Sequence, residues 1–445
     1  MKKVLRRFFE SIILSILITI IISSVFNKIN FLNFQIYGKE TQSKKDEISK
    51  PVVLLVEFLD IKANSYISNS DFYYNILFKK NNYSFYDYFY ENSQGKLEII
   101  GTIYQNDESL SRWFMAPREY KFYENNFYGM GKYPNNTQKL VEDIVNIVDE
   151  KIDFSNHDGD NDGFVDGLII IYAGSYISDN ENKRIYPHSW VVNNIMKKDN
   201  KYINKYVVIS EYMNKPGDFT IGPLCHEFGH ILGGIDLYDL DSHKNFIYDN
   251  HVSNGLGKWS LMSHGVWCKR NIKGDSPVHF DAWHKIYFGW VEALEIEEKE
   301  NIIKLEPIET ENGKVLKITL NAEPYEYLLI ENRQKINFDS YLPAEGILIY
   351  HIDESMLNNC YAYSPYNETP NIKHYKVSII QKDNLYELER GKNLGNKNDV
   401  FVEGDMFIFN QDYKNFSFYN KSVRIVITIL EKQELSYILK IDIYK

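Results

Sequence analysis

Cysteine is scarce in this chain, which has 445 residues and only Cys225, Cys268 and Cys360. A low and odd count excludes a disulfide framework, although one bridge remains possible. The stability of an exported chain with so few crosslinks must come from its core or from bound ions.

Positive charge is also in short supply, because 50 Lys and Arg residues stand against 61 Asp and Glu residues, a net charge of −11. General nucleic-acid binders need a basic surface to neutralise phosphates, so this class is excluded. A hydrophobic content of 44% and a charged content of 25% are typical of a folded globular protein. The length allows one large domain or two ordinary ones.

One long apolar run is present at the N-terminus, where four basic residues in the first seven positions precede the uncharged stretch 11–27. Such a start predicts a signal peptide or an N-terminal membrane anchor over residues 1–27. The basic residues indicate that the start stays in the cytoplasm, so we expect the remainder to be extracytoplasmic, either secreted or anchored to the outer face of the cell membrane. Residues 28–50, charged towards their end, are expected to form a linker.

The rest of the chain shows two kinds of hydrophobic pattern. PVVLLVEFLD (51–60) and GLIIIYAG (167–174) are apolar runs typical of strands buried on both faces. NTQKLVEDIVNIVDEKI (136–152) has helical spacing and begins at Asn136 or Thr137, either of which can cap a helix. Alternation of strand and helix predicts an α/β domain over 51–298. From residue 299 to 445, short runs with period-two alternation predict an all-β, sandwich-like C-terminal module. The expected fold class is therefore α+β.

HEFGHILGGIDLYD (226–239) carries the clearest chemistry. Residues four apart lie on one face of a helix, so His226 and His230 can present two nitrogen ligands to one zinc ion. Gly233 and Gly234 break the helix, which lets Asp236 return as a third ligand and leaves one position open. Glu227 lies beside the first histidine and can reach a water on the metal, which suits a general base.

A purely structural role for this stretch is the alternative, since a bare HExxH also occurs on helices whose histidines are merely buried. Asp236 and the downstream Met262 in GKWSLMSHGVW favour a zinc centre, because zinc peptidases of the metzincin group pair an extended motif with a methionine turn. We expect His264 to lie too close to Met262 to reach the metal and His251 to be exposed. Asp239 and Asp241 are interpreted as solvated or as loop hydrogen-bond acceptors, and Cys225 as a buried thiol.

A second ion site is predicted in HDGDNDGFVDG (157–167). Alternate carboxylates can wrap a hard cation, and Gly163 permits the sharp turn that a calcium loop requires. The acid expected at the twelfth position is absent, since Ile169 stands there, so the loop could also be an acidic turn without an ion. The expected role of calcium is structural. Its predicted ligands are Asp158, Asp160, Asp162, the carbonyl of Phe164, and Asp166.

These motifs together resemble the immune inhibitor A-like metallopeptidases, a family of secreted or surface bacterial zinc endopeptidases that are often calcium-stabilised. The resemblance covers about residues 51–410 and implies zinc ligands at His226, His230 and Asp236 with Glu227 as the base. The sequence departs from the family at Gly234–Ile235, where Leu-Pro is usual. The blocks that carry the resemblance are LVEFLD, DYFYENSQGKLEI, DGDNDGFVDGLIIIYAG, IYPHSW, HEFGHILGGIDLYD, WSLMSHGVW, DAWHKIYFGWVE and ENRQKINFDSYLPAEGILIYHIDE.

The sequence thus predicts a zinc endopeptidase with structural calcium that acts on an extended polypeptide docked along an edge strand. Two alternatives stay open. One is a surface adhesin that kept the fold without catalysis, and the other is a zinc-dependent cell-wall amidase. No nucleic-acid partner is expected, and the membrane is a partner only through residues 1–27.

Overall fold

A computed structural model of the protein describes residues 47–176, 184–239, 253–297, 299–322, 325–359, 375–409 and 423–444. The predicted signal or anchor at 1–27 lies outside these residues, as does most of the predicted linker at 28–50. Residues 46–445 form one compact unit. Among the residues that the structure describes, none of the helices has both the length and the apolar character needed to cross a bilayer.

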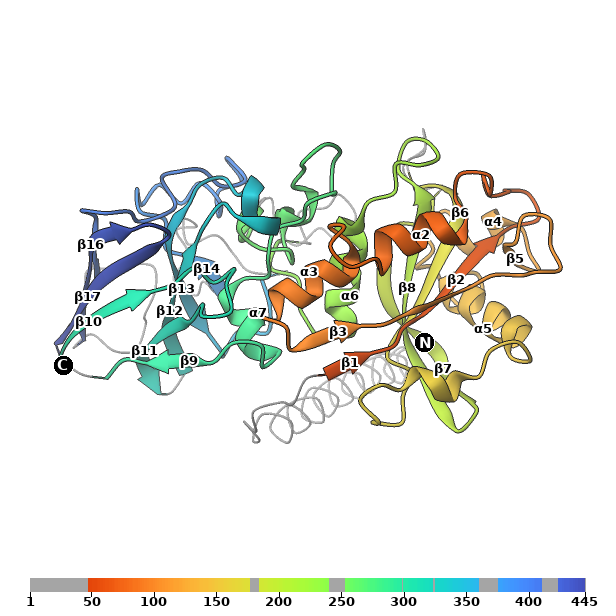
Figure 1. Cartoon of the computed structure of the whole chain (residues 1–445), viewed down its shortest axis with the longest axis horizontal. Coiled ribbons are helices and arrows are strands. Elements are labelled where there is room, and N and C mark those ends of the chain that lie inside the picture. The colour runs from red at the N-terminus through yellow and green to blue at the C-terminus, as the bar shows by residue number, and fades with distance from the viewer. Residues whose placement is uncertain are drawn as a thin grey trace, which may run out of the picture. The chain divides into compact units, whose positions relative to one another are not determined.

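A mixed sheet organises the first part of the unit (Figure 1). Its order is β4-β2-β6-β8-β7, and β5 also pairs with β2. Every neighbouring pair is parallel except β7 with β8, so β7 forms an antiparallel edge. All of β2 is buried, as its continuous apolar run predicts. The strands are β2 (Val52–Glu57), β4 (Thr102–Tyr104), β5 (Phe114–Met115), β6 (Leu168–Ser175), β7 (His188–Lys198) and β8 (Lys201–Tyr212).

Helices cover both faces of this sheet. Successive strand residues point to opposite sides, and on β2 the residues of both sides are apolar and buried. Val52 and Leu54 pack with α4 and α5 in one apolar cluster, whereas Val53 and Leu55 pack with α2, α3 and α6 in another. Asn136 caps α5 by accepting a hydrogen bond from the Lys139 amide, which confirms the predicted start of this helix. The helices are α2 (Ser70–Leu77), α3 (Phe85–Asn92), α4 (Tyr120–Glu124), α5 (Thr137–Val148), α6 (Ile221–Ile231) and α7 (Ala282–Tyr287). Short 3-10 turns are η1 (Phe154–His157), η2 (Gly257–Trp259), η3 (His264–Trp267) and η4 (Asn337–Tyr341).

The C-terminal part consists of two antiparallel-rich sheets that share an apolar cluster including Ile330, Ile349 and Ile427. This agrees with the predicted β module. One sheet has the order β14-β13-β12-β11-β9 and the other β10-β17-β16-β15. The strands are β9 (Ala293–Glu295), β10 (Glu300–Leu305), β11 (Val315–Ala322), β12 (Tyr325–Arg333), β13 (Gly346–Asp353), β14 (Val377–Ile379), β15 (Met406–Phe409), β16 (Arg424–Gln433) and β17 (Ser436–Tyr444).

Two boundaries differ from the sequence-based expectation. β1 (Glu47–Ser49) pairs in parallel with β3 (Leu97–Ile99), although a linker was expected there. β9 belongs to the five-stranded C-terminal sheet through its pairing with β11, although it precedes residue 299. Both pairings join segments far apart in sequence, and local pattern does not reveal such partners.

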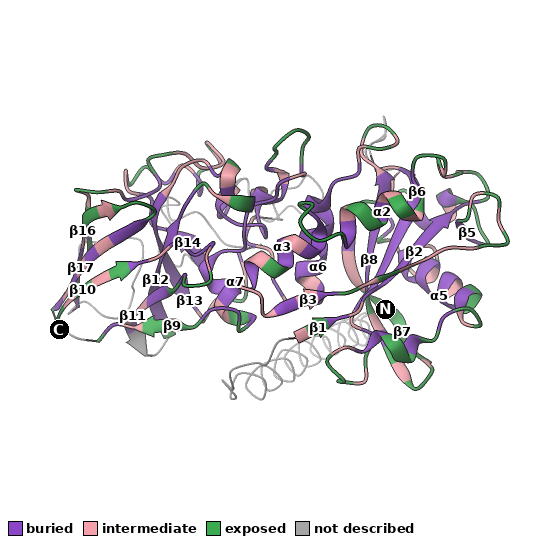
Figure 2. Cartoon of the chain, in the orientation of Figure 1, coloured by how far each residue is buried: buried purple, intermediate pink, exposed green. Residues whose placement is uncertain are grey.

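The β module is not a separate globule. β13 is buried along its whole length (Figure 2), and its Leu348 and Tyr350 belong to the same apolar cluster as Met262 and Val53 of the first part. The core therefore continues from the parallel sheet through α6 to the first C-terminal sheet.

Candidate metal centre

Helix α6 presents the first two candidate ligands. His226 and His230 lie one turn apart on it, and nearly all of its residues are buried. The helix ends at Ile231, and Gly233 follows with φ +97, in the left-handed region that favours glycine. The chain therefore reverses direction within a few residues and brings Asp236 back towards the helix.

Asp236 is the third candidate ligand, and together with His226 and His230 it forms a triangle of ligand atoms, called the triangle below. Its Oδ1 lies 3.2 Å from Nε2 of His226 and 3.4 Å from Nε2 of His230. The other ring nitrogens are engaged, because Nδ1 of His226 donates to the Leu261 carbonyl at 3.0 Å and Nδ1 of His230 donates to that of Gly234 at 2.9 Å. Both Nε2 atoms therefore face a common point with Asp236, an arrangement that could hold a metal ion.

The electrostatics of the triangle favour positive charge. Burial works against the charged imidazolium of His230, but the Asp236 carboxylate raises the pKa of His230 to about 9. Burial alone would raise the pKa of Asp236, yet its contacts with the two histidines hold that pKa well below the usual range. A metal cation would take the place of the protons on the two histidines and would be attracted by the same Asp236 carboxylate.

Glu227 stands beside the triangle without belonging to it. Its side chain is buried, and its Oε2 accepts a hydrogen bond of 2.7 Å from the amide of Ser189, at the start of β7. Burial raises the pKa of Glu227, while His226 and His230 act in the opposite direction. One carboxylate oxygen is thus fixed by the edge strand next to the candidate ligands.

Met262 lies directly against α6, as the sequence predicts for a methionine turn. It is fully buried, and its carbonyl accepts the Leu237 amide at 2.8 Å. A Cβ added to Gly229, between the two histidines, would meet the Met262 sulfur at 2.8 Å. This close approach explains the glycine within HEFGH, whose role was not predicted from the sequence.

The remaining candidates lie outside the triangle. The ring of Tyr238 packs between those of His226 and His264, with centroids 6.2 and 6.0 Å away. Asp239 is buried and accepts a 3.4 Å hydrogen bond from the Ser253 amide, so it is a loop acceptor and not solvated. Cys225 is a buried free thiol, as expected, and Cys268 is also free and buried. Asp241, His251 and Cys360 fall outside the described residues.

Two residues on α7 and its N-cap were not predicted from the sequence. Nε2 of His284 accepts the amide of Ile235 at 3.1 Å, and Nδ1 of His284 donates to Asp281 Oδ2 at 2.7 Å. Asp281 Oδ2 also accepts the hydroxyl of Ser260 at 2.7 Å, which ties it to the methionine turn. The capping pattern of Asp281 before a short helix was the available signal, but its target in space was not readable.

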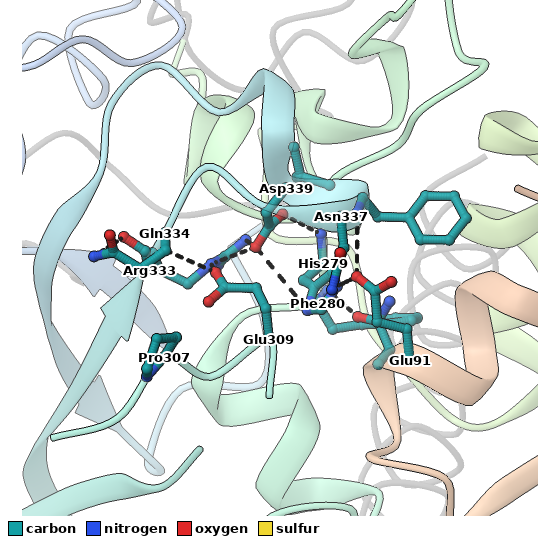
Figure 3. A network of polar contacts seen from close by, with 12 residues as sticks. Glu91, His279, Phe280, Pro307, Glu309, Arg333, Gln334, Asn337 and Asp339 are labelled. Atoms are coloured by element: carbon teal, nitrogen blue, oxygen red, sulfur yellow. Dashed lines mark hydrogen bonds and ion pairs between the residues drawn. The ribbon is translucent and has the colours of Figure 1, made fainter. Parts of the chain in front are cut away.

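The β module also contacts the methionine turn, through Arg333, which belongs to a network of polar contacts that extends to Glu91 (Figure 3). Nη1 of Arg333 donates to the Trp259 carbonyl at 3.0 Å, and Nη2 of Arg333 lies 2.6 Å from Asp339. Asp339 in turn accepts the amide of His279 at 2.8 Å, and Nε2 of His279 lies 2.6 Å from Glu91 on α3. The network therefore joins three regions that are distant in sequence.

In the predicted calcium loop, the carboxylates of Asp158, Asp160 and Asp166 converge. Burial raises the pKa of Asp166 to about 7, and one oxygen of this side chain accepts the Lys50 amide at 2.5 Å. Asp158 forms an ion pair of 2.5 Å with Lys201. Asp162 is not in this group, and its carboxylate accepts the amide of Phe164 at 2.7 Å.

Comparison with known proteins finds one matching family and several relatives, and all of them are described as peptidases or belong to a peptidase family. Residues 36–291 match the family described as immune inhibitor A peptidase M6, catalytic domain. Immune inhibitor A of Bacillus thuringiensis subsp. alesti is 27% identical over 305 residues, which cover 57% of this chain and 42% of that protein. The pre-pro-metalloprotease PrtV of Vibrio cholerae serotype O1 (strain M66-2) is 23% identical over 259 residues, which cover 49% of this chain and 27% of that protein.

The chain thus spans less than half the length of these curated relatives. The family match includes every residue of the triangle, Glu227, Met262 and the Asp281–His284 pair. Because that match extends over more than half of the chain, the protein belongs to the immune inhibitor A peptidase M6 family.

Proposed function

We propose that this protein is an extracytoplasmic, zinc-dependent endopeptidase that hydrolyses peptide bonds in polypeptides. The observation that carries the proposal is the convergence of His226, His230 and Asp236 on one point with the Glu227 carboxylate beside them. Membership of a peptidase family supports the reaction class, and the nitrogen and carboxylate donors fit the preference of zinc.

Zinc held by the triangle would act as a Lewis acid, which would lower the pKa of a bound water and polarise the carbonyl oxygen of the substrate. Glu227 takes the proton from the attacking water and later gives it to the leaving amine. The Ser189 amide holds one oxygen of Glu227 in place, which leaves the other oxygen for the proton. Leu261 and Gly234 carbonyls fix the tautomer of both histidines, so their Nε2 atoms stay available as ligands.

Strand β7 is suited to hold the substrate. It pairs with β8 on one side, and its other side has no partner strand among the described residues. β7 begins next to Glu227, because Ser189 contacts that side chain directly. An extended polypeptide that adds to this edge would pass the candidate base, and backbone pairing of this kind tolerates many sequences.

The decisive experiment is casein hydrolysis by the full chain and by Glu227→Gln, with zinc content measured on both proteins. We expect zinc to remain bound in the variant and hydrolysis to fall by roughly 100-fold or more, since the ligands persist and the proton acceptor is lost. Glu300→Gln, an exposed change on β10, is the control and should keep full activity.

The alternatives are tested in the same experiment. An adhesin without catalysis would hold zinc and leave casein intact in the wild-type chain. A cell-wall amidase would release peptides from peptidoglycan and spare casein. Either outcome would overturn the endopeptidase proposal.

We further propose that residues 157–167 hold a structural calcium ion, supported by the converging carboxylates of Asp158, Asp160 and Asp166. Hard oxygen donors of this kind suit calcium, and the repulsion between them is relieved by a cation. The proposed location outside the cytoplasm rests on the apolar run at 11–27 and is tested by fractionation of the native cell with N-terminal sequencing.

A further inference from the structure

One peptide group in the turn before Asp236 is held from both sides. The carbonyl of Gly234 accepts Nδ1 of the candidate ligand His230 at 2.9 Å. The amide of the next residue, Ile235, belongs to the same peptide plane and donates to Nε2 of His284 at 3.1 Å. This peptide therefore connects the candidate metal ligand with an imidazole on α7.

The protonation of His284 follows from its partners. An amide N–H only donates, so Nε2 of His284 must be the acceptor and Nδ1 must carry the proton. Nδ1 points to Asp281 Oδ2 at 2.7 Å, and Asp281 itself accepts the Ser260 hydroxyl and the His284 amide. Asp281 and His284 are both fully buried.

Aromatic rings fix the plane of this imidazole. The centroids of Trp283, Phe288 and Phe280 lie 4.8, 5.7 and 5.8 Å from the centroid of His284. A buried side chain packed on several sides keeps one rotamer, so the direction of Nε2 is set before any ligand binds.

We propose that Asp281 and His284 are positioning residues for the metal centre, acting through the Gly234–Ile235 peptide. The carboxylate, imidazole and peptide form one hydrogen-bonded chain that ends at the candidate ligand His230, which would hold the metal. This inference rests on the proposed function, because it requires that the triangle binds zinc.

The chain of hydrogen bonds has two effects. First, an acceptor on the Ile235 N–H makes the Gly234 carbonyl a better acceptor for His230, which in turn makes Nε2 of His230 a stronger donor to a metal. Second, the contact fixes the backbone immediately before Asp236. Loss of His284 should weaken metal binding even where the three ligands are intact.

The test measures Zn²⁺ affinity of the full chain by competition with a chromophoric chelator, and the visible absorption spectrum of the Co²⁺-loaded protein. We expect His284→Phe to bind Zn²⁺ about 10-fold to 100-fold more weakly and to show a shifted Co²⁺ spectrum. His284→Gln should recover part of the affinity, because its amide oxygen can accept the Ile235 N–H.

The control variant is Ile427→Ala on β16 in the β module. Ile427 is also fully buried, and its apolar cluster contains no residue of α6, α7 or the methionine turn. This variant should lose stability in the metal-free state while its Zn²⁺ affinity and Co²⁺ spectrum remain those of the wild type. A general loss of stability is thereby separated from a specific effect on the centre.

The outcomes distinguish the two proposals. If the wild type binds no Zn²⁺, the proposed function and this inference both fail. If the wild type binds Zn²⁺ and His284→Phe binds it equally well with an unchanged Co²⁺ spectrum, only the positioning role is overturned. Equal losses of affinity in His284→Phe and Ile427→Ala would also overturn it. Should His284→Phe not fold, His284→Gln decides by the same comparison.

Discussion

Hydrogen bonds to single atoms decide what the candidate ligands can do. Each histidine of the triangle has one nitrogen committed to a backbone carbonyl, and this leaves the other nitrogen for a metal. Gly229 matters for a different reason, since any larger residue there would collide with the Met262 sulfur. The properties of the centre thus depend on partners that are not themselves candidate ligands.

A buried acid outside the centre gives a pH-dependent stability. Glu389 is almost fully buried, its Oε2 accepts Nε2 of Gln381 at 2.5 Å, and burial raises the pKa of Glu389 from 4.5 to about 8. Between these values the folded chain binds a proton that the unfolded chain has released. Stability should therefore fall as pH rises from about 4.5 to about 8, by up to about 1.4 kcal/mol per pH unit.

Glu389→Gln removes this titration, so its thermal midpoint relative to the wild type should increase steadily over that range. Thermal unfolding at closely spaced pH values from about 5 to about 8.5 provides the measurement. Parallel curves for the two proteins would contradict the expectation.

At the scale of helices and strands, the sequence correctly predicted the features that depend only on neighbouring residues. The start of α5 and the buried strands β2 and β6 follow from a capping asparagine and from continuous apolar runs. The spacing of HEFGH likewise predicted that His226 and His230 share one helical face, since both lie one turn apart on α6.

Other features depend on pairing between distant segments. The membership of β9 in the C-terminal sheet, the parallel pairing of β1 and the contact of His284 with Ile235 all join residues that sequence does not associate. Asp162 has the spacing of a calcium ligand, but its carboxylate is not among the three that converge. Spacing defines which residues are candidates, and the backbone path decides which of them converge.

Calcium should stabilise the elements around residues 157–167. The loop connects α5 with β6, and Asp166 also accepts the amide of Lys50 beside β1. At a free Ca²⁺ concentration about 100 times the dissociation constant, the gain is about 2.7 kcal/mol. We expect a higher thermal midpoint with Ca²⁺ than with a chelator, and loss of most of this difference in Asp160→Asn.

Asp107→Asn, an exposed carboxylate outside the loop, serves as the control and should keep the full response. Magnesium at the same concentration should raise the thermal midpoint less than calcium does, because Mg²⁺ demands a tighter octahedral shell than a flexible acidic loop provides. If the thermal midpoint does not change with Ca²⁺, the loop is an acidic turn that binds no ion, and the calcium proposal is wrong.

At the largest scale, the part built on the parallel strands and the β module pack around a shared apolar core. The apolar cluster around Met262 includes side chains from β2, α6, β12 and β13. Charged contacts follow the same path, from Glu91 on α3 to Arg333 at the end of β12. Arg333 of the module donates to the Trp259 carbonyl in the methionine turn, so loss of this contact should reach the metal centre.

Arg333→Leu tests this coupling. Arg333 is fully buried, lies within 3.4 Å of Glu309, Glu331 and Asp339, and donates to the Trp259 carbonyl. Its loss leaves buried carboxylates without their cation, which costs about 3–5 kcal/mol. Lys382→Met removes a half-exposed ion pair with Asp405 and should change stability by no more than about 1 kcal/mol. Calorimetry of the full chain should show a single transition that moves down in Arg333→Leu for both parts together. A separate early transition of the β module, with the zinc-dependent transition unmoved, would show instead that the two parts fold independently.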